Sequence, residues 1–395
     1  MKKRALSLLL AMLMLAAVLS GCAQNTETAQ TSPEKQTETA APAPTPAPEK
    51  TETSPEKTEP ETITIVDHTG AEVTIPANIQ RVAIDQVPLY ATYVMYMGGT
   101  ADKLVGIAAS PKRVLSKSLI MKIAPEIAEV STKQQEEGEL NVEELLNLKP
   151  DVVLYNASNS EHGEMFKKAG IPAVGFNTIN TTSDPVEIYS QWLRLLEQVF
   201  QEPGKMDDAI AYGEELIKTV EERTSSIPEA ERKNVLILFN FNNGTPSVSG
   251  SQKHFGAKWL SRAGVNNAAE EVVGVTEANL EQIYSWDPDL IIMPGPGQCS
   301  ITPKQVLENT VEGADFSPLR AVKEGQVFSN SLGMWSWYVP SCDAPLVLFW
   351  IAQLSYPELF PEDLRELVRE YYHNFYDYDL SEDDLDFIFD RSVAQ

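Results

Sequence analysis

Residues 141–156, NVEELLNLKPDVVLYN, and residues 279–294, NLEQIYSWDPDLIIMP, are two copies of one pattern. Each copy begins with an asparagine, carries a glutamate two residues later and contains a proline–aspartate pair. An asparagine followed after three residues by Glu144 or Gln282 predicts a helix start, because its side chain accepts a backbone N–H there. Proline ends the helix, and the apolar run behind it is typical of a parallel strand buried on both faces. The chain therefore contains two related α/β units.

The sequence around the two copies extends this alternation of strands and helices. Residues 63–76 predict a hairpin, and further strands are expected at 81–84, 104–109, 173–176, 234–240 and 326–330. One long amphipathic helix over 204–226 joins the two halves, and helices over 184–198, 345–354 and 364–375 complete them. We expect an α/β fold of two doubly wound parallel-sheet lobes, joined by one long rigid helix, with a ligand cleft between the lobes. The boundaries are an N-terminal lobe over 62–202, a linker helix over 203–232 and a C-terminal lobe over 233–395.

The first 61 residues are not expected to belong to this fold. Residues 1–21 place three basic residues before an apolar stretch, which is typical of a secretory signal and too short for a membrane span. The signal ends in LSGC, a sequence that resembles a bacterial lipobox, so Cys22 is the expected lipidation site. Residues 22–61 are rich in Pro, Thr and Glu and have almost no apolar side chains, which predicts a disordered tether.

Composition excludes several classes of function. The formal net charge of −26 argues against nucleic acid or an anionic lipid surface as a partner. The four histidines are far apart and show no metal-ligand spacing, so neither a bare-metal receptor nor a bound cofactor is indicated. An enzyme on the same lobes is disfavoured because the chain lacks a nucleophile elbow, a zinc-binding helix motif and a phosphate-binding loop.

Five phrases resemble the substrate-binding lipoproteins of bacterial ABC importers for ferric siderophores, haem and cobalamin. They are VDHTGAEVTIPANIQRVAI (66–84), the two repeat copies, SPLRAVKEGQVF (317–328) and SYPELF (355–360). The resemblance implies a monomer, anchored by lipid on the outer face of the cell membrane, that delivers its ligand to an ABC permease and its ATPase. It also implies that Glu143 and Glu281, one on each lobe, contact arginines of the permease. A first-turn carboxylate also favours the helix dipole, so a purely structural role remains open.

We expect the ligand beyond the carboxyl ends of the strands, where several loops meet, among them 110–113 and 241–249. The aromatic segment 332–340 favours a large flat ligand, and the basic pair in the loop 110–113 favours an anionic one. Three structural alternatives remain open: the basic pair is solvated, one tryptophan packs under the next helix, and the histidine makes hydrogen bonds instead of binding the ligand. The predicted ligand-binding residues are Tyr90, Lys112, Arg113, Asn242, His254, Trp335, Trp337 and Tyr338.

The ligand expected from the resemblance is a ferric siderophore, with haem or a corrinoid as alternatives. A surface sensor lipoprotein without an importer is a further alternative. Cys299 and Cys342 both follow strands of the second lobe, and we expect them to lie close together and to be candidates for a disulfide.

Overall fold

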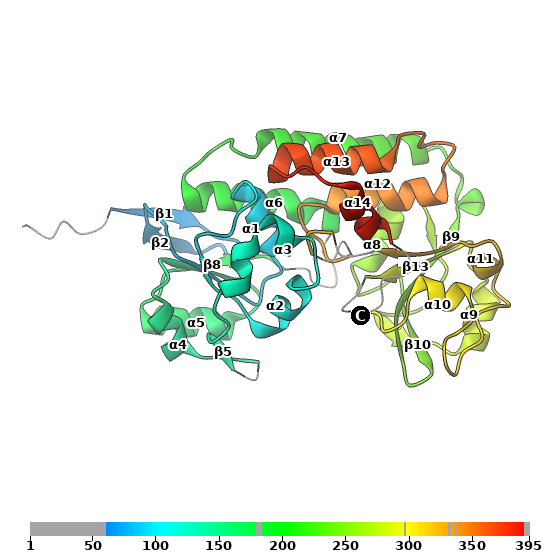
Figure 1. Ribbon diagram of the computed structural model, residues 1–395, viewed down its shortest axis with the longest axis horizontal. Helices are drawn as coiled ribbons and strands as arrows, with labels where there is room; N and C mark the ends of the chain where they lie inside the picture. Colours follow the sequence, from blue (N-terminus) through cyan, green and yellow to red (C-terminus); the bar gives the residue numbers. More distant parts are fainter. Residues whose placement is uncertain are drawn as a thin grey trace, which may run out of the picture. The chain divides into compact units, whose positions relative to one another are not determined.

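The computed structural model describes most of the chain after residue 60 (Figure 1). The predicted signal segment and the predicted tether up to residue 60, with Cys22, lie outside it, as does Trp337. The described ranges are 61–136, 138–178, 184–295, 298–330, 333–335 and 338–390. Among these residues no helix is both long and apolar enough to cross a membrane.

The first lobe is built on a parallel sheet with the strand order β4-β3-β7-β8. Alternate residues along β3 face different sides: Val82 and Ile84 join one buried apolar cluster and Ala83 joins another. The sheet is therefore covered on both faces, as its apolar runs predict. The elements of this lobe are β1 (Thr62–Val66), β2 (Glu72–Pro76), β3 (Val82–Asp85), α1 (Tyr90–Tyr96), β4 (Leu104–Gly106), α2 (Ala109–Leu115), α3 (Ile120–Ile123), η1 (Pro125–Glu129), β5 (Gln135–Glu136), β6 (Glu139–Leu140), α4 (Val142–Leu148), β7 (Val152–Asn156), α5 (Ser160–Ala169) and β8 (Ala173–Phe176).

The second lobe has a mixed sheet with a parallel centre. Strands β11, β9, β13 and β14 are parallel, whereas β10 and β12 are antiparallel additions on one side of β9. Its elements are η2 (Glu229–Glu231), β9 (Asn234–Asn242), β10 (Thr245–Ser249), α8 (Gly256–Arg262), β11 (Asn266–Asn267), β12 (Val275–Glu277), α9 (Leu280–Trp286), β13 (Leu290–Pro294), α10 (Pro303–Leu307), α11 (Arg320–Lys323) and β14 (Val327–Asn330).

Five further helices pack as a group with both lobes. They are α6 (Pro185–Phe200), α7 (Asp207–Thr224), α12 (Ala344–Ser355), α13 (Leu364–Tyr376) and α14 (Glu382–Phe389). The predicted linker helix is α7, which packs along α12 and α13 (Figure 1). Helix α13 also packs against α1, where the Tyr371 hydroxyl lies 3.8 Å from the sulfur of Met95. In α14, Asp384 pairs with Lys122 of α3. The two-lobe α/β fold is confirmed. Helices α13 and α14, which follow the second lobe in the sequence, contact the first lobe.

The two copies of the repeat have the same local structure. The side chains of Asn141 and Asn279 accept the backbone N–H of Glu144 and Gln282, at 3.0 and 2.7 Å, so both predicted helix caps are confirmed. Each helix then ends in a left-handed residue immediately before the proline, Lys149 or Asp287.

The aspartate of each copy is bonded to the backbone at the start of the strand beside the repeat strand, β3 in the first lobe and β9 in the second. Asp151 accepts the backbone N–H groups of Gln80 and Arg81 at 2.7 and 2.8 Å. Asp289 accepts the N–H of Asn234 at 2.8 Å. We call each of these contacts an aspartate clamp, and together they align the repeat strand with the strand beside it.

Two loop predictions were wrong. The segment Ser110–Arg113 lies inside helix α2, where Pro111 is tolerated because the first turn needs no N–H donors. The segment Phe241–Ser249 is a hairpin: β9 continues to Asn242, and Asn243 and Gly244 turn with φ of 50° and 82°. An Asn-Gly pair with positive φ at both positions is a hairpin signal.

The cysteine prediction was also wrong. Cys299 and Cys342 are both free and buried, and they belong to different apolar clusters. The thiol of Cys342 lies 2.8 Å from the hydroxyl of Tyr376, between α12 and α13.

We expect the aspartate clamps to contribute measurably to stability. Asp151→Ala should lower the free energy of unfolding by about 1–2 kcal/mol, because two backbone donors lose a charged acceptor. Asp289→Ala should cost about 1 kcal/mol, since one backbone donor is affected and the ion pair with the half-exposed Arg320 adds little. Urea denaturation measures both, with Asp208→Ala as the exposed control; equal stability of all four proteins would contradict the expectation.

Candidate functional site

Residues 333–335, which follow strand β14 of the second lobe, contact the first lobe. The carbonyl of Gly333 accepts the N–H of Leu119 at 3.1 Å, and the carbonyl of Met334 accepts the hydroxyl of Ser118 at 2.8 Å. The next residue, Trp335, packs edge-on against Tyr90 of α1, with ring centroids 5.6 Å apart. We call the region formed by these residues the lobe junction. It brings together two predicted ligand-binding residues, Tyr90 and Trp335.

Both of those aromatic side chains carry a buried polar atom without a hydrogen-bond partner among the described residues. These atoms are the hydroxyl of Tyr90 and Nε1 of Trp335. Tyr90 as a whole is 1% exposed. Burial, with the charge of Asp85 nearby, raises the pKa of Tyr90 well above its usual value, so the hydroxyl keeps its proton. An unpaired buried donor costs free energy. The lobe junction therefore offers two neutral donors, one from each side.

His254 lies in an aromatic cluster beside the lobe junction. Its Nδ1 accepts the N–H of Gly256 at 3.2 Å and lies 2.7 Å from the hydroxyl of Ser249. Its ring contacts Phe239 and Tyr338, with centroids 5.4 and 6.2 Å away. Burial lowers the pKa of His254 to about 4, so the ring is neutral at pH 7. These contacts of Nδ1 with Gly256 and Ser249 fit the alternative that His254 makes hydrogen bonds within the protein instead of binding the ligand.

The described residues of the aromatic segment do not form an exposed surface. Tyr338 is 1% exposed, and its carbonyl accepts Nε1 of Trp259 at 3.1 Å. Burial also raises the pKa of Tyr338. Trp335 is half-buried against Tyr90, and Trp337 lies outside the described residues.

The predicted polar residues occupy different environments. The ammonium of Lys112 donates to the carbonyls of Ala128 and Val130, at 2.7 and 2.6 Å, within the first lobe. Arg113 is exposed in the last turn of α2. Asn242 is exposed at the tip of the β9–β10 hairpin. Lys112 thus supports its own lobe, whereas Arg113 and Asn242 face solvent.

Sequence reasoning missed a buried pair at the carboxyl end of β3. Oδ2 of Asp85 lies 2.6 Å from Nδ1 of His162, and both residues are buried. Burial raises the pKa of Asp85, and the hydrogen bond from His162 opposes this rise. An acidic residue directly after a buried strand was the available signal, but its partner on α5 is distant in sequence. Among the described residues no group of three or more His, Cys, Asp or Glu side chains could hold a metal.

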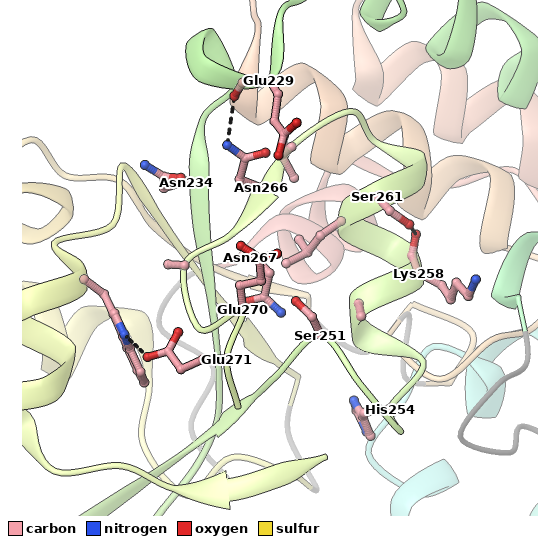
Figure 2. A pocket seen from close by; sticks show the side chains of 15 residues that line it. Glu229, Asn234, Ser251, His254, Lys258, Ser261, Asn266, Asn267, Glu270 and Glu271 are labelled. Carbon is pink, nitrogen blue, oxygen red and sulfur yellow. Dashed lines mark hydrogen bonds between the residues drawn. The ribbon is translucent and has the colours of Figure 1, made fainter. Parts of the chain in front are cut away.

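A polar pocket of about 500 Å³ opens on the second lobe beside α8 and β11. Figure 2 shows His254 at one end of this pocket and Asn266, Glu270 and Glu271 along it. His254 thus contacts both this pocket and the aromatic cluster. Nothing further in the described residues assigns the pocket a ligand.

Glu143 and Glu281 are exposed in the first turns of α4 and α9. Each helix buries a single residue, Leu145 or Ile283. The two glutamates therefore occupy equivalent surface positions on the two lobes.

Comparison with known proteins decides the family. The family model described as "Periplasmic binding protein" matches residues 90–330, which is more than half of the chain. The chain belongs to the periplasmic binding protein family.

This periplasmic binding protein is similar to two known sequences. The molybdate-binding protein MolA of Haemophilus influenzae is 25% identical over 330 residues, covering 79% of this chain and 90% of the relative. The uncharacterised ABC transporter substrate-binding lipoprotein YvrC of Bacillus subtilis is 26% identical, covering 83% and 90%.

Solved structures agree with these matches. A periplasmic solute-binding protein of Veillonella parvula superposes with a TM-score of 0.74 at 27% identity, covering 84% of this chain and 98% of that one. The structure of MolA bound to molybdate gives a TM-score of 0.65 at 24% identity, covering 81% and 99%. This periplasmic binding protein is a substrate-binding protein of an ABC transporter and not an enzyme.

The depressed pKa of His254 predicts a dependence of stability on pH. The unfolded state binds a proton near pH 6.5 and the folded state only near pH 4, so stability is lost as pH falls between these values. His254→Gln should therefore lose less stability than wild type between pH 7 and pH 5, as measured by urea denaturation. The exposed His373→Gln is the control. An unchanged pH dependence in His254→Gln would contradict the expectation.

Proposed function

We propose that this periplasmic binding protein is the extracytoplasmic receptor of an ABC importer for a metal-containing anion. It captures the anion at the lobe junction and delivers it to the permease and its ATPase. The observation that carries this proposal is the pair of buried neutral donors, Tyr90 and Trp335, which come from different parts of the chain and lie against each other. A ligand that reaches both groups would supply the missing acceptors.

The chemistry of these donors favours a compact oxyanion such as molybdate. Its oxygens accept hydrogen bonds from neutral O–H and N–H groups, which stabilise charge without an ion pair. Of the two predicted cations, Lys112 already donates to two carbonyls. The similarity to MolA, whose name states that it binds molybdate, supports the same ligand class.

A ferric siderophore is the second candidate, with haem or a corrinoid as variants of it. The aromatic density around Trp335 and Tyr338 favours a large ligand, and the exposed Arg113 offers a cation for an anionic rim. These ligands require that the junction opens, because Tyr90 and Tyr338 are each 1% exposed.

Calorimetry on ligand-free protein separates the two candidates. Sodium molybdate and tungstate test the oxyanion, with sulfate as the tetrahedral anion of smaller size. A ferric hydroxamate and a ferric catecholate test the chelate. Saturable binding of molybdate or tungstate alone supports the oxyanion proposal, and binding of a chelate alone overturns it in favour of the second candidate.

Attachment to the membrane is proposed through Cys22 and the tether of residues 22–61. The lipobox-like LSGC and the similarity to substrate-binding lipoproteins support this anchor. A lipid with a long polar tether would keep the receptor near its permease on the outer face of the membrane.

Removing either neutral donor should weaken ligand binding. Tyr90→Phe and Trp335→Phe each lose one hydrogen bond to a charged ligand, worth about 1.5–3 kcal/mol, or roughly 10- to 100-fold in affinity. Tyr96→Phe is the matched control, because its hydroxyl donates to Glu202. Wild-type affinity of both junction variants for a probe that binds would place the ligand elsewhere.

The exposed glutamates should act in transport and not in capture. A Glu143→Ala/Glu281→Ala double variant should keep ligand affinity but reduce uptake by cells that contain the permease, and lysine at either position should reduce it further. Glu144→Ala, in the same turn of α4, is the control. Normal uptake by the double variant would rule out this docking surface.

A further inference from the structure

The backbone of Met334 is bonded on both sides by side chains from two distant parts of the chain. Its carbonyl accepts the hydroxyl of Ser118, before α3, at 2.8 Å. Its N–H donates to the hydroxyl of Tyr372, on α13, at 3.1 Å. Met334, Ser118 and Tyr372 are all buried, so water does not compete for these bonds.

The hydroxyl of Tyr372 is itself oriented by a buried acid. It donates to Oδ2 of Asp343 at 3.3 Å, while Tyr376 donates to Oδ1 at 2.7 Å. With its proton directed at Asp343, the oxygen of Tyr372 presents a lone pair to the N–H of Met334. The acid at the start of α12 therefore orients the hydroxyl of Tyr372 so that its oxygen can accept the N–H of Met334.

The first lobe holds the same segment through a second bond. Leu119 N–H donates to the carbonyl of Gly333 at 3.1 Å, one residue before Met334. The residue after Met334 is Trp335, whose ring packs edge-on against Tyr90. Side-chain position at Trp335 therefore depends on the bonds made by the two residues before it.

We infer that Ser118 and Tyr372 are positioning residues that form a latch on Met334 and hold the indole of Trp335 against Tyr90. Each acts through the backbone of residues 333–335, and neither needs to contact the ligand. This inference rests on the proposed function, in which Trp335 is a ligand donor. The latch links Trp335 to α3 and α13. Loss of the hydrogen bond to one of these helices therefore also frees the backbone of Met334 from the other.

Amide hydrogen exchange on ligand-free protein tests the latch directly. Tyr372→Phe removes the acceptor of the Met334 amide, and Ser118→Ala removes the donor to its carbonyl. If the latch is one unit, Tyr372→Phe speeds exchange of the Leu119 amide, and Ser118→Ala speeds exchange of the Met334 amide, by about tenfold or more. In each variant the amide that is measured belongs to a different hydrogen bond from the one that the substitution removes. If each substitution affected only its own bond, exchange of that amide would not change.

Matched controls remove the same groups elsewhere. Tyr371→Phe deletes a buried hydroxyl on the same helix that donates to Cys342, and Ser355→Ala deletes a buried serine hydroxyl bonded within α12. Neither control should change exchange at Leu119 or Met334. If the Tyr372 and Ser118 variants speed exchange only on their own side, or no more than the controls do, the latch is overturned.

A binding experiment distinguishes failure of the latch from failure of the proposed function. Stopped-flow tryptophan fluorescence follows release of sodium molybdate, and both latch variants should release it several-fold faster than wild type and controls. If wild type does not bind molybdate, the oxyanion proposal fails, while the exchange result still decides the latch. Binding with unchanged release in both variants overturns the positioning role.

Discussion

The two aspartate clamps are the contacts on which the architecture depends. In each lobe the aspartate behind the proline binds the backbone at the start of β3 or β9, so the repeat strand enters the sheet beside it. The register that follows pairs Val82 with Val152 in the first lobe and Val235 with Leu290 in the second. Because the paired strands are parallel, their carboxyl ends lie at one edge of each sheet. That edge supplies Asp85 and leads into Tyr90.

Sequence predicted what is encoded locally and missed what depends on folding. The asparagine caps and the proline–aspartate turns were found because each signal lies within a few residues. The Asn243–Gly244 turn was equally local but was interpreted as part of a loop. Contacts such as Asp85 with His162 join residues from separate elements, and no pattern along the chain marks them. Tyr90 and Trp335 were predicted as site residues, but their burial against each other was not.

The proposed anion receptor must reconcile two opposing requirements, because the protein itself is acidic. The net charge of −26 repels an anion at long range, yet a buried cation would be costly without a partner. Neutral donors avoid the second cost, since an unfilled site leaves only two unpaired dipoles. The neutral state of His254 fits the same environment, because burial depresses its pKa. Selection by such a site depends on the shape and acceptor geometry of the ligand more than on its charge.

Helix α13 lies near the C-terminal end of the sequence, but it packs on α1, which lies in the early part of the first lobe. A secreted protein emerges from the membrane with its N-terminus first. The first lobe, although it emerges early, therefore lacks part of its apolar cluster until α13 has been translocated. We expect the protein to fold after export as one cooperative unit, and premature termination before α13 to leave the surface of α1 exposed to proteases.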